Sequence, residues 1–327
     1  MGLMGISHGS GLGTELYVTF FKKQAEQHGI TVKVNPIFKE AKTLDFCLHL
    51  ESLNINLLKR SKTNALLPYP EHFFSIDNID KVDYILCASE LCRNLFLDLK
   101  YLYNFSYEVI YISSTSPIPS KIDIRNLNYE KFLHLSGVSP LKNTRTVLET
   151  WLSEPNFPEL NLVCLDRQEY RSCFRECADL ISKAQKSKNI KIVSQKLSEL
   201  DKFNLQSNCG FAICPSEAES FGHYINEAKG FGSIVISTNY PPMNELIRPD
   251  FGFLLNSTSK TERGFFSIPL QTFKHVELKR LVNLSINLPL EKKLQMSQNA
   301  RNSFIKNDLF CKAEFNKFLN KVLLSQK

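Results

Sequence analysis

The alternation of two kinds of segment is the feature that most constrains how this chain folds. Short runs of β-branched and aromatic residues, such as Ile234 to Ile236, alternate with amphipathic segments of about 10 to 15 residues. This pattern indicates repeated β-α units that build a mainly parallel sheet. It pauses at Ser113 to Ser120, where two prolines stand among serines, and then restarts. We interpret that stretch as a linker between two domains.

The length of 327 residues fits two domains of roughly 150 residues each. We therefore predict an α/β protein with one Rossmann-like domain over residues 1–120 and a second over residues 121–305. Residues 306–327 complete the chain as a helix, because an apolar face repeats at helical spacing between Lys312 and Leu324.

Composition narrows the class of protein. No apolar run approaches the roughly 18 residues of a membrane-spanning helix, and Met1 to Ile6 lacks the charged start of a secretion signal. The nine cysteines include no Cys-x-x-Cys pair, and several stand in apolar context, which favours reduced thiols and a cytoplasmic protein. Cys173 and Cys177 could share one helix face, but no neighbouring His or Cys completes a metal site.

The formal net charge is +7, with lysines and arginines dispersed along the chain. This mild basic excess suits an anionic partner, such as a nucleoside diphosphate or the acidic face of a membrane. A solvated basic surface explains any single lysine equally well. Nucleic-acid binding requires a clustered basic stripe with interleaved aromatic residues, and the sequence contains none. We therefore expect no nucleic-acid partner.

One segment carries most of the chemistry. From Cys214 to Glu227 the sequence reads Cys-Pro-Ser-Glu-Ala-Glu-Ser-Phe-Gly-His-Tyr-Ile-Asn-Glu. It predicts the end of a strand, a turn, and a helix that begins near Gly222. The unpaired amides and the positive dipole end of a helix N-terminus bind anions well. Glu219 and Glu227 flank that point, so each can bind hydroxyl groups at one end of an extended ligand whose diphosphate lies between them.

This segment resembles the donor site of retaining glycosyltransferases of the GT-B fold, family 4. Their signature is a glutamate, seven residues and a second glutamate, within a Pro-Ser-x-x-Glu-Gly-Phe-Gly-like sequence. Ser220 replaces the usual glycine. The segments Gly232 to Thr238 and Pro242 to Glu245 resemble the strand and the acid-bearing loop that follow in the family. The residues that match the signature are Pro215, Ser216, Glu219, Phe221, Gly222 and Glu227.

The resemblance implies two Rossmann-like domains that face each other across a cleft, with the last helix packing back on the first domain. It also implies that Glu219 contacts hydroxyl groups of the donor sugar and that Glu227 contacts those of the ribose. The backbone amides of Ser220, Phe221 and Gly222 would hold the phosphates. The alternative is that Glu219 is a loop charge and Glu227 a solvated helix residue.

A second match lies at Phe132 to Asn143. Family members carry an arginine and a lysine here, and both neutralise the leaving diphosphate. Lys142 fits the lysine, whereas Val138 stands in place of the arginine. Arg145, one helical turn along, is a candidate substitute for that arginine. The alternative for Lys142 is a surface lysine at the start of a helix.

A third match is Ser7 to Glu15, a glycine-rich loop between the first strand and a helix. It lacks the Gly-x-Gly-x-x-Gly spacing, because Thr14 and Leu16 stand where the last glycine is required, so NAD binding is disfavoured. By resemblance, Gly11 and Gly13 lie near the transferred sugar and the leaving phosphate. A simple tight turn is the alternative.

The remaining candidates are single residues. His72, in Pro70-Glu71-His72, follows a first-domain strand where the family presents acceptor-side groups, and an ordinary loop pair is the alternative. Glu245 is a candidate in the acid-bearing loop. We interpret His134, within a strand, as a hydrogen-bonded core histidine, and Trp151 as a core residue.

The resemblance implies transfer of a hexose from a nucleoside-diphosphate sugar to a hydroxyl of a glycan, a lipid or a protein-linked glycan, with anomeric retention. The donor is a co-substrate, and no cofactor or metal is expected, because no Asp-x-Asp motif occurs. Two alternatives stay open. One is a nucleotide-sugar 2-epimerase on the same fold, and the other is a catalytically silent binding protein, which Val138 favours. We expect a cytoplasmic protein, with peripheral membrane contact as a further expectation.

Overall fold

The structure is a computed structural model of the 327-residue chain and describes residues 2–8, 12–36, 43–166 and 172–324. The chain divides into two units. Unit 1 comprises residues 1–117, 263–268 and 306–327, and unit 2 comprises residues 118–262 and 269–305. The sequence analysis places its boundaries after residues 120 and 305. It does not anticipate the short segment 263–268, which returns to unit 1.

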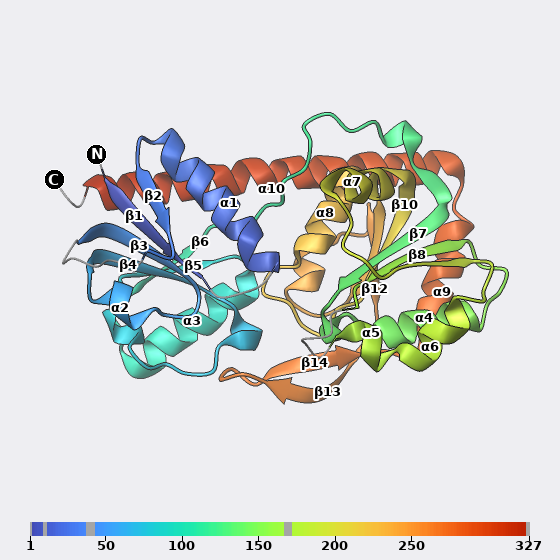
Figure 1. Cartoon of the computed structure of the whole chain (residues 1–327), viewed down its shortest axis with the longest axis horizontal. Helices are drawn as coiled ribbons and strands as arrows, with labels where there is room; N and C mark the ends of the chain where they lie inside the picture. The colour runs from blue at the N-terminus through green and yellow to red at the C-terminus, as the bar shows by residue number, and fades with distance from the viewer. Residues whose placement is uncertain (1, 9–11, 37–42, 167–171, 325–327) are drawn as a thin grey trace. The chain divides into compact units, whose positions relative to one another are not determined.

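Unit 1 is built on a parallel sheet (Figure 1). Among the described residues this sheet has six strands, in the order β2-β1-β3-β4-β5-β6. The order belongs to doubly wound folds, in which the winding reverses between β1 and β3. The strands are β1 (Leu3–Ser7), β2 (Thr31–Val34), β3 (Leu44–Glu51), β4 (Ser61–Pro68), β5 (Tyr84–Cys87) and β6 (Glu108–Tyr111).

The C-terminal part of the last helix packs in unit 1. Its Phe315 ring lies 4.5 Å from the ring of Phe21, and its Phe318 ring lies 5.5 Å from that of Phe46. This helix, α10 (Leu290–Leu324), begins earlier than the predicted start at residue 306. Its first part has its own apolar stripe, because Met296, Ala300 and Phe304 are buried at four-residue spacing. The other helices of unit 1 are α1 (Leu12–Gln27), α2 (Ile55–Leu58) and α3 (Glu90–Tyr103).

Unit 2 contains a second parallel sheet. Within the described ranges it has six strands, in the order β12-β11-β10-β7-β8-β9. The two central strands, β7 and β10, are neighbours at the point where the winding reverses, and ligands of open α/β sheets bind at such a point. The strands are β7 (Asn128–Gly137), β8 (Glu159–Cys164), β9 (Ile190–Val193), β10 (Cys209–Cys214), β11 (Ile234–Thr238) and β12 (Gly252–Leu255).

Both faces of this second sheet are covered by helices. Phe132 stacks on Phe211 with 4.6 Å between ring centroids, and Trp151 lies 5.3 Å from Phe132, fully buried as predicted. Side chains alternate along a strand, so Leu133 and Ala212 point to the opposite face, toward the other helices. The first face is covered by α4 (Thr144–Leu152), α6 (Ala178–Ala184) and α9 (His275–Ile286), and the second by α7 (Glu199–Asn208) and α8 (His223–Phe231).

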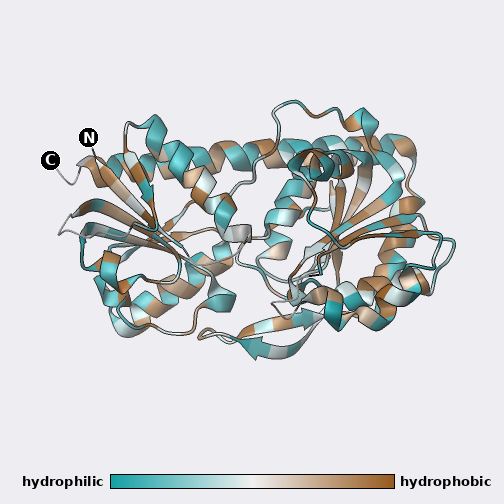
Figure 2. Ribbon diagram, in the orientation of Figure 1, coloured by the Kyte–Doolittle hydropathy of each residue, from teal (hydrophilic) through white to brown (hydrophobic). Residues whose placement is uncertain are grey.

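The hydropathy of the strands explains the fold class. Figure 2 shows mostly hydrophobic strands in both sheets and helices that carry both hydrophobic and hydrophilic residues. Strands buried on both faces are expected to be apolar throughout, and helices that cover them need one apolar stripe. The predicted α/β class with two Rossmann-like parts is confirmed.

A two-stranded ribbon follows β12, and the sequence analysis does not predict it. It consists of β13 (Thr258–Arg263) and β14 (Ile268–Thr272). Most residues of β13 are exposed, and its sequence Thr-Ser-Lys-Thr-Glu-Arg carries no apolar alternation from which a strand could be read. The segment of residues 263–268, which includes the turn between the two strands, belongs to unit 1.

Two findings concern membrane-spanning helices and the state of the cysteines. Across the described residues, no helix has both the length and the hydropathy needed to cross a bilayer. All nine cysteines lie in the described part of the chain, where each is buried and none forms a disulfide.

His134 joins three elements of unit 2, as the interpretation of a core histidine requires. Its Nδ1 lies 2.8 Å from the carbonyl oxygen of Ile213 in β10, and its Nε2 lies 2.9 Å from Oγ1 of Thr144 in α4. A carbonyl only accepts, so Nδ1 carries the proton and Nε2 accepts from the threonine hydroxyl. Burial lowers the pKa of His134 to about 4.

We predict that unit 2 loses stability as the pH falls from about 6.5 toward 4. The pKa of His134 is lower in the folded state than in the unfolded chain, so protons bind preferentially to the unfolded state below about pH 6.5. Each pH unit in this window should cost about 1.4 kcal/mol for this one histidine. Urea unfolding followed by fluorescence of Trp151, the sole tryptophan, reports on unit 2.

The histidine contribution can be isolated with two variants. His134→Gln should reduce the slope by about 1.4 kcal/mol per pH unit and leave the contribution of the buried His223. His275→Gln, at an exposed position of unit 2, should leave the slope unchanged. An equally steep pH dependence in His134→Gln would contradict this assignment.

Candidate active site

Lys142 lies at the carboxyl end of β7, in the short 3-10 helix η4 (Pro140–Lys142). The Ser139 hydroxyl accepts from the amide of Leu141 and caps this turn. Asn143 then adopts a left-handed conformation, with φ of 50°, and its Nδ2 donates to the carbonyl oxygen of Pro215 at 2.8 Å. The turn that carries Lys142 is therefore tied to the loop that leaves β10.

Glu219 lies in that loop and meets Lys142. The Lys142 ammonium donates to Oε1 of Glu219, and the Ser216 hydroxyl donates to the same oxygen. The two side chains of the ion pair are mostly buried, with exposed fractions of 16% and 15%. The two residues lie 77 positions apart in sequence and come together because β7 and β10 are adjacent.

The ring of Tyr224 lies below the ammonium group of Lys142. The distance from Nζ to the ring centroid is 3.9 Å, which is within the range of a cation–π contact. The Tyr224 hydroxyl is hydrogen-bonded to Ser216. Tyr224, Ser216, Glu219 and Lys142 therefore form a closed ring of contacts.

Helix α8 begins directly beside this ring of contacts. Its N-cap is Gly222, whose φ of 103° lies in the left-handed region that favours glycine. A Cβ at this position would meet Ile225 Cδ1 at 3.0 Å. Ser220 and Phe221, the other two predicted phosphate-binding positions, lie in the same turn and are buried. The predicted helix start near Gly222 is confirmed.

The electrostatics of the helix start favour an anion. His223, the first residue of α8, is buried, and its pKa is lowered to about 3 by burial first and then by the charges of Lys142 and Lys202. Two lysines therefore act on the same point as the positive end of the helix dipole. This combination stabilises negative charge at the N-terminus of α8.

Glu227 lies one turn further along α8 and is held by α7. Its carboxylate oxygens accept from Lys202 Nζ at 3.0 to 3.1 Å and from Gln206 Nε2 at 3.1 Å. Only 6% of the Glu227 side chain is exposed. The alternative interpretation of Glu227 as a solvated helix residue is therefore wrong.

Arg145 and Val138 have other partners in unit 2. The Arg145 guanidinium binds Asp179 at 2.8 Å and the carbonyl oxygen of Glu176 at 2.7 Å. In the structure its charge is therefore engaged on the side of α6, and its role as a substitute cation stays a prediction. Val138 packs against the hydrophobic cluster of Leu133 and Val163.

The remaining predicted residues lie in other places. Gly13 is in the first turn of α1 in unit 1, and Gly11 lies outside the described residues. His72 belongs to unit 1, in η1 (Pro70–His72), where its Nδ1 is 3.3 Å from the Arg263 guanidinium. Glu245 is exposed in η5 (Met243–Leu246) of unit 2.

The base of the β13–β14 ribbon is attached to the loop that carries Glu219. Lys260 of β13 forms an ion pair with Glu217, whose side chain is only 8% exposed. The amide of Gln271 in β14 donates to the Glu217 carbonyl at 2.9 Å, and its own carbonyl accepts from Asn143 Nδ2 at 3.1 Å. The ribbon therefore holds both segments that carry the ion pair.

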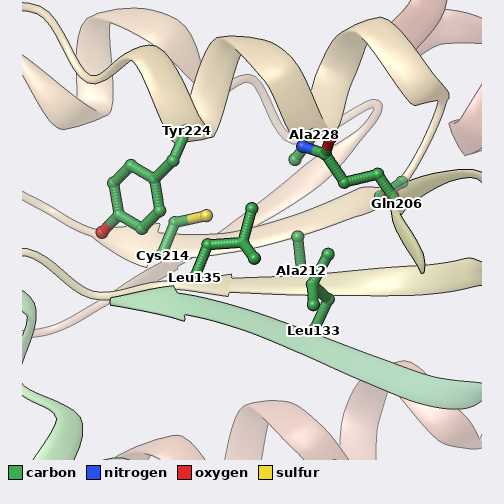
Figure 3. A pocket seen from close by; sticks show the side chains of 8 residues that line it. Leu133, Leu135, Gln206, Ala212, Cys214, Tyr224 and Ala228 are labelled. Carbon is green, nitrogen blue, oxygen red and sulfur yellow. The ribbon is translucent and has the colours of Figure 1, made fainter. Parts of the chain in front are cut away.

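A small cavity lies between α8 and the sheet (Figure 3). Its walls are more apolar than polar and carry no charged side chain, so it is a space in the packing under α8 and does not suit a charged donor. Tyr224 and Gln206, which contact Ser216 and Glu227, border it. The lining residues are Leu133, Leu135, Gln206, Ala212, Cys214, Tyr224, Ala228 and Ser233.

Sequence reasoning missed Tyr224, Lys202, Gln206 and Lys260. The position of Tyr224, eight residues after Ser216, would have suggested proximity once the turn was known. Lys202, Gln206 and Lys260 belong to elements whose contacts with the motif depend on tertiary packing. No local sequence signal marks them.

Solved structures share this fold. HepE of Anabaena, crystallised with UDP and glucose, is 17% identical, with a TM-score of 0.66 over 99% of this chain and 100% of that chain. Sucrose-phosphate synthase of Thermosynechococcus elongatus is 11% identical, with a TM-score of 0.71 over the same shares. The pneumococcal O-GlcNAc transferase GtfA is 16% identical, with a TM-score of 0.63 over 85% of this chain and 57% of that chain. The architecture is that of GT-B glycosyltransferases.

The family follows from the sequence of unit 2. Residues 120–263 match the family model described as Glycosyl transferases group 1. This part of the chain, which includes Lys142, Glu219 and Glu227, is similar to the group 1 glycosyltransferases. The enzyme class predicted from the sequence, a glycosyltransferase, is confirmed. No curated protein sequence matches the chain.

We predict that Lys260→Ala loosens the loop at residues 215–222. Loss of the lysine leaves the mostly buried Glu217 carboxylate without this partner, at a cost of about 1 kcal/mol because Lys260 itself is partly exposed. Hydrogen exchange should therefore become several-fold faster in this loop. Lys274→Ala, at an exposed position of unit 2, is the control.

The ion pair itself is tested by exchanging its charges. The double variant Glu217→Lys with Lys260→Glu should return most of the protection that Lys260→Ala loses. Unchanged exchange in Lys260→Ala would show that the ribbon does not hold this loop through the ion pair.

Proposed function

We propose that this protein transfers a sugar, a hexose by resemblance, from a nucleoside-diphosphate sugar to a hydroxyl acceptor with retention of anomeric configuration. The observation that carries the proposal is the contact of Lys142 with Glu219 beside the start of α8. A cation, a helix N-terminus and a carboxylate together suit a ligand that has both phosphates and hydroxyl groups. The UDP and sugars in the HepE and GtfA crystal structures support this donor class.

The proposed reaction needs no nucleophile from the protein. The bond between the sugar C1 and the diphosphate oxygen breaks, and the acceptor oxygen bonds to C1 on the same face of the ring. The acceptor proton passes to the leaving phosphate oxygen. Lys142 and the amides of Ser220, Phe221 and Gly222 stabilise the negative charge that develops on the diphosphate. We assign no metal or cofactor to this reaction, since the phosphates have these partners and the sequence lacks an Asp-x-Asp motif.

Two carboxylates hold the two sugar rings of the donor in this proposal. Glu219 binds hydroxyl groups of the transferred sugar, and Glu227 binds those of the ribose. Both carboxylates already accept hydrogen bonds from neighbouring side chains, Glu227 from Gln206 and Glu219 from Ser216. Gly11, Gly13, His72 and Glu245 are assigned to the donor or acceptor by resemblance alone.

The acceptor is proposed to be a hydroxyl of a glycan, a lipid or a protein-linked glycan, with a peripheral membrane contact of the protein. Leu97, Tyr101, Leu102 and Tyr103 of α3 all expose apolar surface, and Tyr101 is 92% exposed. Exposed tyrosine and leucine near the end of a helix suit the interface of a bilayer, because the ring is apolar and its hydroxyl is polar. The net charge of +7 favours an anionic surface.

We predict opposite effects of Glu219→Gln on turnover and on binding of UDP. Turnover should fall by about 100-fold or more, because the carboxylate that binds the sugar is lost. Affinity for UDP alone should rise by roughly threefold to fivefold, since Lys142 no longer has Glu219 as a competing anion. Transfer assays and calorimetry measure the two quantities. Glu219→Ala should also nearly abolish turnover while the fold survives.

The control for this pair of effects is Glu262→Gln, at an exposed position of unit 2. It should change neither quantity. Near-normal turnover in either Glu219 variant would overturn the proposed role of this residue.

We predict that one nucleotide class among UDP-, GDP- and ADP-sugars stabilises unit 2. A ligand at 100 times its dissociation constant adds about 2.7 kcal/mol to the free energy of unfolding. Unfolding monitored by Trp151 fluorescence ranks the panel. Lys142→Met should lose most of the stabilisation from the preferred donor, and full stabilisation in this variant would contradict the role of Lys142.

An assay with the preferred donor distinguishes the proposed sugar transfer from its two alternatives. Appearance of labelled sugar on an acceptor supports transfer. Conversion of the donor to a different sugar without an acceptor indicates a 2-epimerase, and binding without any turnover indicates a silent binding protein.

A further inference from the structure

Tyr224 contacts both members of the Lys142–Glu219 pair, directly on one side and through Ser216 on the other. Its ring faces Lys142 Nζ at 3.9 Å from the centroid. Its hydroxyl reaches Ser216, whose hydroxyl reaches Glu219. Figure 3 shows that the ring extends from α8 past Cys214 at the end of β10, with the hydroxyl at the far end from the helix.

The directions of the two hydrogen bonds that connect Tyr224, Ser216 and Glu219 are fixed by chemistry. A carboxylate only accepts, so Ser216 uses its single hydrogen toward Glu219. The oxygen of Ser216 therefore accepts from the Tyr224 hydroxyl. Burial raises the pKa of Tyr224 well above its ordinary value, so the hydroxyl keeps the proton that this arrangement needs.

The ring matters because Lys142 must change partners when a donor binds. In the structure its charge is paired with Glu219, and in the proposed function both groups turn to the donor, Lys142 to the diphosphate and Glu219 to the sugar. An aromatic face attracts an ammonium group without taking a hydrogen bond from it or cancelling its charge. The ring can therefore hold Lys142 in place while its hydrogen bonds move from one anion to the other.

We propose that Tyr224 is a positioning residue that holds Lys142 at the diphosphate site through its ring and orients Glu219 through its hydroxyl and Ser216. The inference rests on the proposed function. It offers a physical reason why Lys142 can bind the diphosphate without a second cation, although Val138 stands where similar glycosyltransferases carry an arginine. A lysine that is held in place loses less side-chain entropy on binding the phosphates.

The first test needs no ligand. In protein with ¹³C-labelled lysine, the ring current of Tyr224 should shift the Lys142 Cε–H signal upfield, and Lys142→Arg assigns that signal. The shift should persist in Tyr224→Phe, which keeps the ring, and disappear in Tyr224→Leu. A Lys142 signal at the position of an exposed lysine in the unaltered protein would overturn the proposal.

The second test measures the affinity for UDP in a double-mutant cycle. Tyr224→Leu should weaken binding by about tenfold, whereas Tyr224→Phe should weaken it less than about threefold. In a Lys142→Met background the leucine substitution should have no further effect. Equal losses in both backgrounds would show that Tyr224 supports only the packing of α8, and would overturn the proposal.

The hydroxyl has its own measurement. Tyr224→Phe should lower kcat for transfer more than it lowers UDP affinity, because the relay to Glu219 acts on the sugar and not on the diphosphate. Equal changes in both quantities would overturn this half of the proposal. Tyr224→Met replaces the leucine variant in both tests if thermal unfolding shows that the leucine variant does not fold.

The outcomes also separate this inference from the proposed function. A shifted Lys142 signal in a protein that binds none of UDP, GDP or ADP would support the contact and count against the proposed function. Strong binding of UDP with an unshifted signal would support the function and overturn the role of Tyr224.

Discussion

The ion pair of Lys142 and Glu219 depends on one feature of the sheet in unit 2, the adjacency of β7 and β10. The winding reverses between these strands, so the chain segments that follow them diverge to opposite faces and leave room at their carboxyl ends. Each segment supplies one charge to that space. Because both charges are mostly buried, the other contacts there serve to satisfy or hold them.

Three sets of contacts support the Lys142–Glu219 pair. Asn143 and Gln271 join the two loops through backbone carbonyls, and Lys260 neutralises the nearby Glu217 carboxylate. Tyr224 completes the contacts from the side of α8. Since most of these groups are mostly buried, each has few alternative positions, which keeps the side chains of the proposed site in place.

The same loop has a structural role and, in the proposed function, a role in donor binding. Its carboxylates are paired with lysines in the structure, and in the proposed function a donor replaces the contacts of Glu219 and Lys142 with its own hydroxyl groups and phosphates. Binding in such a site exchanges one set of charge-assisted hydrogen bonds for another, so selectivity for a ligand with the right spacing of groups is larger than the net affinity suggests.

The sequence by itself determined the α/β class and the helix start at Gly222, and it predicted Lys142, Glu219 and Glu227 as site residues. These follow from local periodicity and from a motif of contiguous residues. Only the tertiary structure decided that Tyr224 faces Lys142, that Lys202 and Gln206 hold Glu227, and that residues 263–268 belong to unit 1. Such contacts join segments that are close only after the sheet has formed, and residue type carries no record of which distant segment will lie beside it.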